Sequence, residues 1–115
     1  MLRLLNKLLG QKSFADLSAA EYTERFPGEN DHLLLDVRTP AEFKQIKVKR
    51  SKNIPLDQLS DRMKEIPQDQ PVVVICATGR RSRAAASQII RAGHEEVYNF
   101  KGGLQAWQRA GLSLK

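Results

Sequence analysis

The chain has 115 residues, of which 41% are hydrophobic and 28% are charged, and its formal net charge is +6. This length suits one domain and leaves no room for two. The only cysteine, Cys76, excludes an internal disulfide and a zinc site made of several cysteines. His32 and His94 have no ligand spacing, so we expect neither a metal nor a cofactor. The reducing cytoplasm is the default location.

The positive charge favours anionic partners, which by charge alone could be small oxyanions, acidic protein faces, nucleic acid or anionic lipid, and a solvated basic surface is a better explanation than any one of them. We expect no nucleic-acid partner. Leucines at positions 2, 4, 5, 8 and 9 give residues 1–13 the pattern of an amphipathic helix. This segment is too short to span a bilayer, and it lacks the features of a secretion signal. We expect an extension that packs on the domain (residues 14–115) or on a second subunit. A weak membrane-surface anchor is the alternative, without firm membrane association.

Helix signals and apolar runs alternate along the chain. Ser18 and Glu21 form a capping box that begins a helix ending near Phe26, and Thr39 and Glu42 form a second box. The remaining predicted elements are strands at 33–37, 53–54, 71–76 and 97–99 and helices at 56–66, 82–92 and 104–110. Unbroken apolar strands between helices predict an α/β fold whose parallel sheet is covered on both faces. Ligands of such sheets bind at the carboxyl ends of the strands.

Cys76 lies at such an end. The segment from Val72 to Ser82 reads as a strand, a tight loop and the start of a helix. Loop N–H groups and the positive end of the helix would favour a thiolate, or a persulfide anion, on Cys76. Gly79 permits backbone angles that a side chain would forbid, and Arg80 and Arg81 add positive charge. A buried structural cysteine is the plainer alternative.

Several motifs in their expected order resemble the rhodanese-like family. The resembling segments are Leu34-Leu-Asp36-Val-Arg38-Thr-Pro40-Ala-Glu42-Phe43, Asn53-Ile-Pro55-Leu56, Cys76-Ala-Thr-Gly79-Arg80-Arg81-Ser82, Gly93-His94, Val97-Tyr98-Asn99 and Gly102-Gly103-Leu104-Gln-Ala106-Trp107. The third matches the family's Cys-x-x-Gly-x-Arg-Ser loop. The likeness runs from about Phe14 to Trp107. It implies a rhodanese-like fold, with a parallel sheet of about five strands between helices.

The resemblance also implies a reaction. A sulfur donor such as thiosulfate gives sulfur to the catalytic Cys76, and an external thiol or cyanide removes it. The substrate-binding residues would then be Ala77, Thr78, Gly79, Arg80, Arg81 and Ser82, which cradle the anion mostly through their backbone. Arg81 could instead tie the loop to Asp36 or Glu42. Asp36, Arg38 and Glu42 are candidate supporting residues, with Asp36 and Arg38 expected to be a buried structural pair.

One stretch departs from the family pattern. Where the family has Gly-His-Ile and then Gly-Ala, this chain has Ile46-Lys47-Val48 and then Arg50-Ser51, so we expect a turn of different shape. The change also creates a basic cluster, which is either a solvated surface or a docking face for an acidic partner. The cluster comprises Lys44, Lys47, Lys49, Arg50 and Lys52.

Two other functions compete with sulfur transfer. Cysteine phosphatases and arsenate reductases place an arginine six residues after the cysteine, whereas here Arg81 is the fifth residue and Ser82 the sixth. This shorter loop suits one sulfur atom better than a phosphoryl group. The other alternative is a protein-docking sulfur carrier or regulatory module that turns over small donors poorly.

Overall fold

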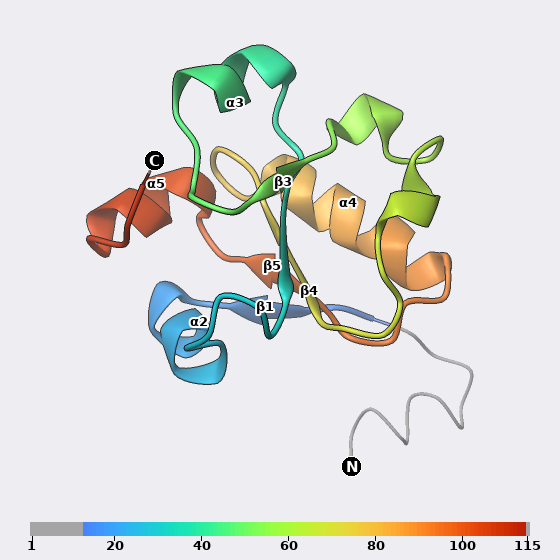
Figure 1. Cartoon of the computed structure of the whole chain (residues 1–115), viewed down its shortest axis with the longest axis horizontal. Helices are drawn as coiled ribbons and strands as arrows, with labels where there is room; N and C mark the ends of the chain where they lie inside the picture. The colour runs from blue at the N-terminus through green and yellow to red at the C-terminus, as the bar shows by residue number, and fades with distance from the viewer. Residues whose placement is uncertain (1–12, 115) are drawn as a thin grey trace.

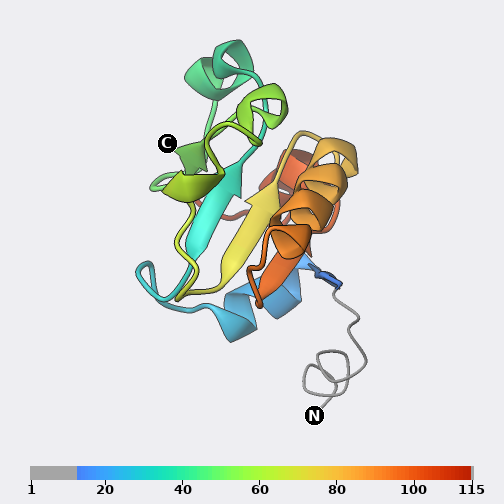
Figure 2. The same cartoon turned by 90° about the vertical axis from the view of Figure 1, so that its right-hand side faces the viewer.

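The computed structural model describes residues 13–114, which form one five-stranded sheet between helices (Figures 1 and 2). The strand order is β1-β5-β4-β2-β3, and every pair is parallel. The strands are β1 (Ala15–Leu17), β2 (Leu33–Asp36), β3 (Lys52–Asn53), β4 (Val72–Ile75) and β5 (Val97–Phe100). The predicted α/β class with a parallel sheet is confirmed.

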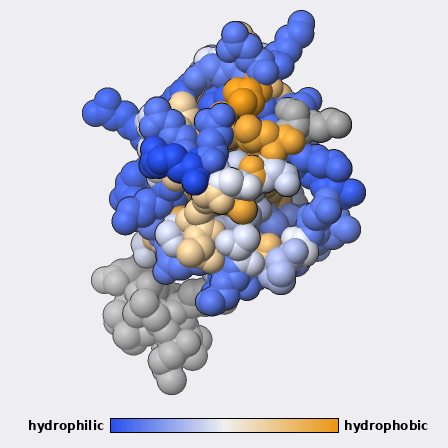
Figure 3. Space-filling view, turned by 90° about the vertical axis from the view of Figure 1, so that its left-hand side faces the viewer, coloured by the Kyte–Doolittle hydropathy of each residue, from blue (hydrophilic) through white to orange (hydrophobic). Residues whose placement is uncertain are grey.

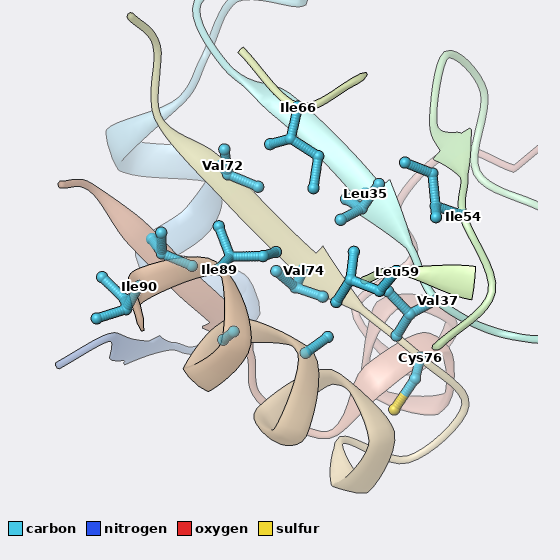
Figure 4. Close-up of a cluster of buried hydrophobic side chains, with 13 residues drawn as sticks. Leu35, Val37, Ile54, Leu59, Ile66, Val72, Val74, Cys76, Ile89 and Ile90 are labelled. Atoms are coloured by element: carbon cyan, nitrogen blue, oxygen red, sulfur yellow. The ribbon is translucent and has the colours of Figure 1, made fainter. Parts of the chain in front are cut away.

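The helices cover both faces of this sheet, as predicted. They are α2 (Ala19–Arg25), α3 (Pro40–Gln45), α4 (Arg80–Arg91) and α5 (Gly103–Arg109), with the 3₁₀ helices η1 (Leu56–Gln58) and η2 (Met63–Glu65). Alternate residues of each strand point to opposite faces, so the sheet divides the core in two. Val74 and Cys76 pack with α4, whereas Val73 and Ile75 pack on the other face, with α2 and α5. Figure 4 shows the α4 side of the core, which includes Cys76.

The predicted helix boundaries rest on local chemistry that the structure reproduces. The side chains of Ser18 and Thr39 each accept a hydrogen bond from the backbone N–H three residues on. In return, the carboxylates of Glu21 and Glu42 accept a hydrogen bond from the backbone N–H of Ser18 and Thr39. Both capping boxes are therefore confirmed. Gly93 has a φ of 109°, which only glycine adopts easily and which allows the chain to leave α4 at this point.

Three details of the predicted element order are wrong. Residues 56–66 form η1, a turn and η2 instead of one helix, because Ser60 and Asp61 favour turns over a helix interior. Strand β1 was not predicted, since it has three residues of which only Leu17 is buried. Helix α4 begins at Arg80 instead of Ser82, so the predicted loop from Ala77 to Arg81 is shorter than expected.

The predicted amphipathic segment at 1–13 lies, except for its last residue, outside the described residues. Within residues 13–114, none of the helices has the length and apolar character needed to cross a membrane.

The turn that departs from the family pattern has an unusual backbone. Val48 O accepts hydrogen bonds from the N–H and the hydroxyl of Ser51, which closes a turn around Lys49 and Arg50. Arg50 has a φ of 68°. A side chain with a β-carbon is strained in this left-handed region, typically by about 1 kcal/mol or more. The turn therefore has a glycine-like conformation at Arg50.

This strain predicts that Arg50→Gly raises the free energy of unfolding by about 0.5–1 kcal/mol, since the ion pair with Glu29 that it removes is exposed and weak. Urea unfolding measures the change, as a shift of the midpoint concentration with an unchanged m-value. Lys49→Gly is the matched control, because Lys49 has no positive φ, and it should lower stability. If both variants lose stability equally, Arg50 is not strained.

Candidate active site

Cys76 lies just beyond the carboxyl end of β4, between the neighbouring strands β2 and β5. Only three residues separate it from Arg80, the first residue of α4, and Gly79 makes the sharp turn with a φ of 109°. No side chain caps the start of α4, so its first N–H groups are free to point toward the sulfur. The cysteine is 1% exposed.

Two hydrogen-bonding groups lie close to the sulfur. Gly79 N–H donates to Cys76 Sγ at 3.0 Å, and Ser82 Oγ lies 3.3 Å from it. Burial raises the pKa of the Cys76 thiol, but hydrogen bonds from Ser82, Gly79 and Thr78 lower it by more, so the pKa lies below its ordinary value. The loop can thus stabilise negative charge on sulfur, either as a thiolate or on a second sulfur atom attached to Cys76.

Helix α5 is hydrogen-bonded to the backbone of the loop. Its amides Leu104 N–H and Gln105 N–H donate to the carbonyl oxygens of Cys76 and Ala77 at 2.7 and 3.2 Å. Gly103 makes this approach possible, because a β-carbon there would lie 2.5 Å from the Cys76 carbonyl oxygen and 2.6 Å from the Ala77 carbonyl group. The backbone of the loop is therefore fixed by α5 as well as by its own turn.

Arg81 ties α4 to α3. Its two terminal nitrogens donate to the two carboxylate oxygens of Glu42 at 2.7 and 3.0 Å. These bonds are the main reason that the pKa of Glu42 falls to about 2. Of the alternatives that the sequence left open, the structure places Arg81 on Glu42 and not on Asp36. A bidentate pair of this kind fixes the orientation of both side chains.

Asp36 and Arg38 form the predicted buried pair, 0% and 3% exposed. Arg38 Nη2 donates to Asp36 Oδ2 at 2.8 Å and to the carbonyl oxygen of Ile46 at 2.6 Å. Since Ile46 ends α3, the pair anchors that helix to the end of β2. Asp36 and Arg38 therefore support the loop indirectly: they hold α3, and Glu42 of α3 binds Arg81.

Comparison with known proteins agrees with this architecture. The family model of the rhodanese-like domain matches residues 18–110. The chain belongs to the rhodanese-like domain family. It is 35% identical over 99 residues to a sulfurtransferase of Allochromatium vinosum, covering 86% of this chain and 92% of the relative. It is also 35% identical over 82 residues to the thiosulfate sulfurtransferase GlpE of Vibrio cholerae, covering 71% of this chain and 77% of GlpE.

A solved structure gives the same result for the fold. The crystal structure of a rhodanese-related protein from Thermoplasma volcanium superposes with a TM-score of 0.80 at 30% identity, and the match covers 89% of this chain and 98% of that one. The matched region of this rhodanese-like domain takes in Cys76, its loop and the helices that hold the loop.

The remaining predicted site residues differ in exposure. Arg80 and Thr78 are exposed, Ala77 is half-buried, and Ser82 is fully buried on the first turn of α4. Arg80 has no hydrogen-bond or ion-pair partner within residues 13–114, unlike Arg81. Arg80 is therefore the arginine next to the loop whose charge is available to an incoming anion.

Two residues of the predicted basic cluster pair with carboxylates from other segments. Arg50 pairs with Glu29, and Lys52 pairs with Glu65 at 3.1 Å. Lys47 Nζ lies 5.0 Å from the centre of the Phe43 ring. Partners from other segments thus take up part of the positive charge that the sequence places together.

Two residues at the site were missed from the sequence. Asn99, on β5, accepts a hydrogen bond from Ser82, and Asp16, on β1, accepts one from Asn99. A polar residue inside the apolar run Val97–Phe100 is the signal that could have revealed Asn99. Asp16 gives no such signal, because it lies in an exposed three-residue strand.

The face of α2 and α5 carries a separate cavity of about 340 Å³. Tyr22, Phe26, His32 and Trp107 line it, and Figure 3 shows hydrophobic side chains gathered among hydrophilic ones on this side of the molecule. The lining does not include Cys76 or its loop. In the described part of the chain, no group of three His, Cys, Asp or Glu side chains is placed to hold a metal ion.

The close contact of α5 with the loop predicts that Gly103→Ala is severely destabilising, by about 3 kcal/mol, because its β-carbon would collide with backbone atoms. The matched control is Gly111→Ala, which has a positive φ of 73° but open space around it, and which should cost about 1 kcal/mol. Urea unfolding compares the two. Equal losses would show that α5 does not constrain the loop.

Proposed function

We propose that this rhodanese-like domain is a sulfurtransferase that moves sulfane sulfur from thiosulfate or a persulfide donor to cyanide or a thiol through a persulfide on Cys76. The observation that supports it best is the position of Cys76 Sγ, 3.0 Å from Gly79 N–H at the free N-terminus of α4. A tight turn of backbone amides favours a small anion with concentrated charge. The terminal sulfur of a persulfide is such an anion.

The reaction takes place in two half-reactions. The Cys76 thiolate attacks the sulfane sulfur of thiosulfate, an S–S bond to Cys76 forms, the bond to the sulfite group breaks, and sulfite leaves with the electron pair. Cyanide carbon or a thiolate then attacks the outer sulfur, and Cys76 leaves as the thiolate. The residues from Ala77 to Ser82 bind the donor and the outer sulfur through their N–H groups.

The acceptor comes from outside the chain, because Cys76 is its only cysteine and no second thiol can resolve the persulfide. A small thiol or a docked protein with an acidic face both fit the exposed cation at Arg80. We place the reaction in the cytoplasm, where thiol acceptors are reduced. A carrier that delivers sulfur only to a docked protein is the second form of the proposal, and we infer no nucleic-acid partner.

A phosphatase or arsenate reductase reaction is disfavoured by the same geometry. Such reactions need an arginine that wraps a tetrahedral oxyanion bound at the loop. Arg81 instead makes two hydrogen bonds to Glu42 and is held away from that task.

Thiosulfate should add the mass of one sulfur atom to the intact protein, and a thiol reductant should remove it. Cys76→Ser should lose both this mass gain and the formation of thiocyanate from cyanide, because the variant lacks the nucleophile. Intact-mass spectrometry and a thiocyanate assay measure the two effects. Thiocyanate formation by Cys76→Ser at the wild-type rate would refute the proposal.

Replacing the free cation beside the loop should slow capture of an anionic donor. We expect Arg80→Gln to lower kcat/KM for thiosulfate about threefold at low salt while kcat changes little, since long-range attraction raises the association rate. The deficit should shrink above about 0.15 M salt, where the Debye length is about 8 Å. Arg91→Gln is the control, because Arg91 is exposed at the other end of α4. An equal deficit in both variants, or one independent of salt, contradicts this role.

A further inference from the structure

A chain of buried and partly buried hydrogen bonds leads from Cys76 to Asp16 on the edge strand β1. Ser82 Oγ lies 3.3 Å from Cys76 Sγ and donates to Asn99 Oδ1 at 2.5 Å. Asn99 Nδ2 then donates to Asp16 Oδ1 at 3.0 Å. Ser82 and Asn99 are 0% and 2% exposed, so water does not compete for the bonds that Ser82 makes, whereas the bond to the partly exposed Asp16 is partly buried. The chain joins four residues of four different elements or loops and ends at the carboxylate of Asp16.

The ionised state of Asp16 sets the donor and acceptor in each of these hydrogen bonds. Hydrogen bonding from Asn99 is the main reason that the pKa of Asp16 is lowered, so Asp16 is an ionised carboxylate and can only accept. The amide nitrogen of Asn99 must then face Asp16, and its oxygen must face Ser82. Because Asn99 presents an acceptor, the hydroxyl of Ser82 donates to it and turns its lone pairs toward Cys76.

In this direction the hydroxyl of Ser82 favours a thiol over a thiolate, although the N–H of Gly79 donates to the sulfur in either form. The S–H group of Cys76 can donate to Ser82 Oγ while Ser82 donates to Asn99, and every group is satisfied. A thiolate needs donors. The backbone N–H groups of Thr78, Gly79 and Ser82 supply some of them, but the hydroxyl of Ser82 has only one proton, which it can give to the sulfur or to Asn99 but not to both. If Ser82 turns that proton to the sulfur, Asn99 Oδ1 is left buried without a donor, which is costly.

We propose that Asp16 and Asn99 are positioning residues for Cys76: held by Asp16, the amide of Asn99 competes with the Cys76 sulfur for the hydroxyl proton of Ser82. The competition opposes ionisation of the free cysteine. The competition ends once Cys76 carries a second sulfur, because the negative charge then lies on the outer sulfur, among the loop N–H groups. The hydroxyl of Ser82 can then donate its hydrogen bond to Asn99 without loss to the anion. This consequence rests on the proposed persulfide chemistry, whereas the competition itself does not.

Other charged groups lie on the elements around the loop, and the proposal leaves them unchanged. Arg81 on α4 is paired with Glu42 of α3, and Asp36 at the end of β2 is paired with Arg38. Arg80, at the start of α4, has no partner among the described residues. At the Asp16 end of the hydrogen-bond chain, Arg83 donates to both carboxylate oxygens of Asp16. The test must therefore separate the hydrogen-bond chain from a simple change in charge.

The test is the pKa of Cys76, measured as the pH dependence of its alkylation by iodoacetamide and of the thiolate ultraviolet absorbance, without any sulfur donor. Asn99→Leu removes the competing acceptor, and Asp16→Asn frees the amide of Asn99 to turn its nitrogen to Ser82. Both should lower the pKa by about one pH unit, equal to about a tenfold larger thiolate fraction below the pKa. Ser82→Ala removes a donor and should raise it.

The Ser82→Ala background supplies the control. If Asp16 and Asn99 act through Ser82, then Asp16→Asn and Asn99→Leu should not shift the pKa of Cys76 in that background. A shift that persists there is a charge or packing effect and overturns the proposal, as does an unchanged or raised pKa in the single variants. Asp16 is partly exposed, so Asp16→Asn keeps the fold even if Asn99→Leu does not. A negative result here leaves sulfur transfer standing, and absent sulfur transfer leaves the pKa test valid.

Discussion

The structure depends on keeping one buried sulfur close to backbone amides. Cys76 is almost inaccessible, and a buried anion is costly unless donors surround it. The chain meets this need with backbone N–H groups. It turns at Gly79 directly from β4 into α4, whose N-terminus has no side-chain cap. The parallel sheet makes this arrangement available, because it brings the end of the central strand β4 and the beginning of α4 to one edge.

Elements from both sides hold the short loop in place. Helix α5 binds the carbonyl oxygens of Cys76 and Ala77, and Gly103 allows the two backbones to meet. On the other side, Glu42 of α3 binds Arg81, and the buried pair of Asp36 and Arg38 holds α3. The side chains around the loop thus mostly position it, and its backbone N–H groups remain available to an anion.

Local sequence patterns left two features of the structure undecided. Leu59 and Ile66 are buried, as the apolar spacing of residues 56–66 indicates, but that spacing fits 3₁₀ turns as well as an α-helix. The ion pairs of the basic cluster also depend on distant segments, because Glu29 and Glu65 reach Arg50 and Lys52 from elsewhere in the sequence. Local pattern is reliable where capping or an apolar run decides the outcome, and it fails where a partner is distant in sequence.

The sequence by itself determined the fold class, the capping boxes at Ser18 and Thr39, and the strand, loop and helix around Cys76, because each depends on residues within one or two turns of each other. Tertiary structure alone decided that Arg81 binds Glu42, 39 residues away, and that Asn99 binds Asp16, 83 residues away. Those contacts depend on the order in which parallel strands are laid beside one another. Strand order is set by how the whole core packs and not by any local signal.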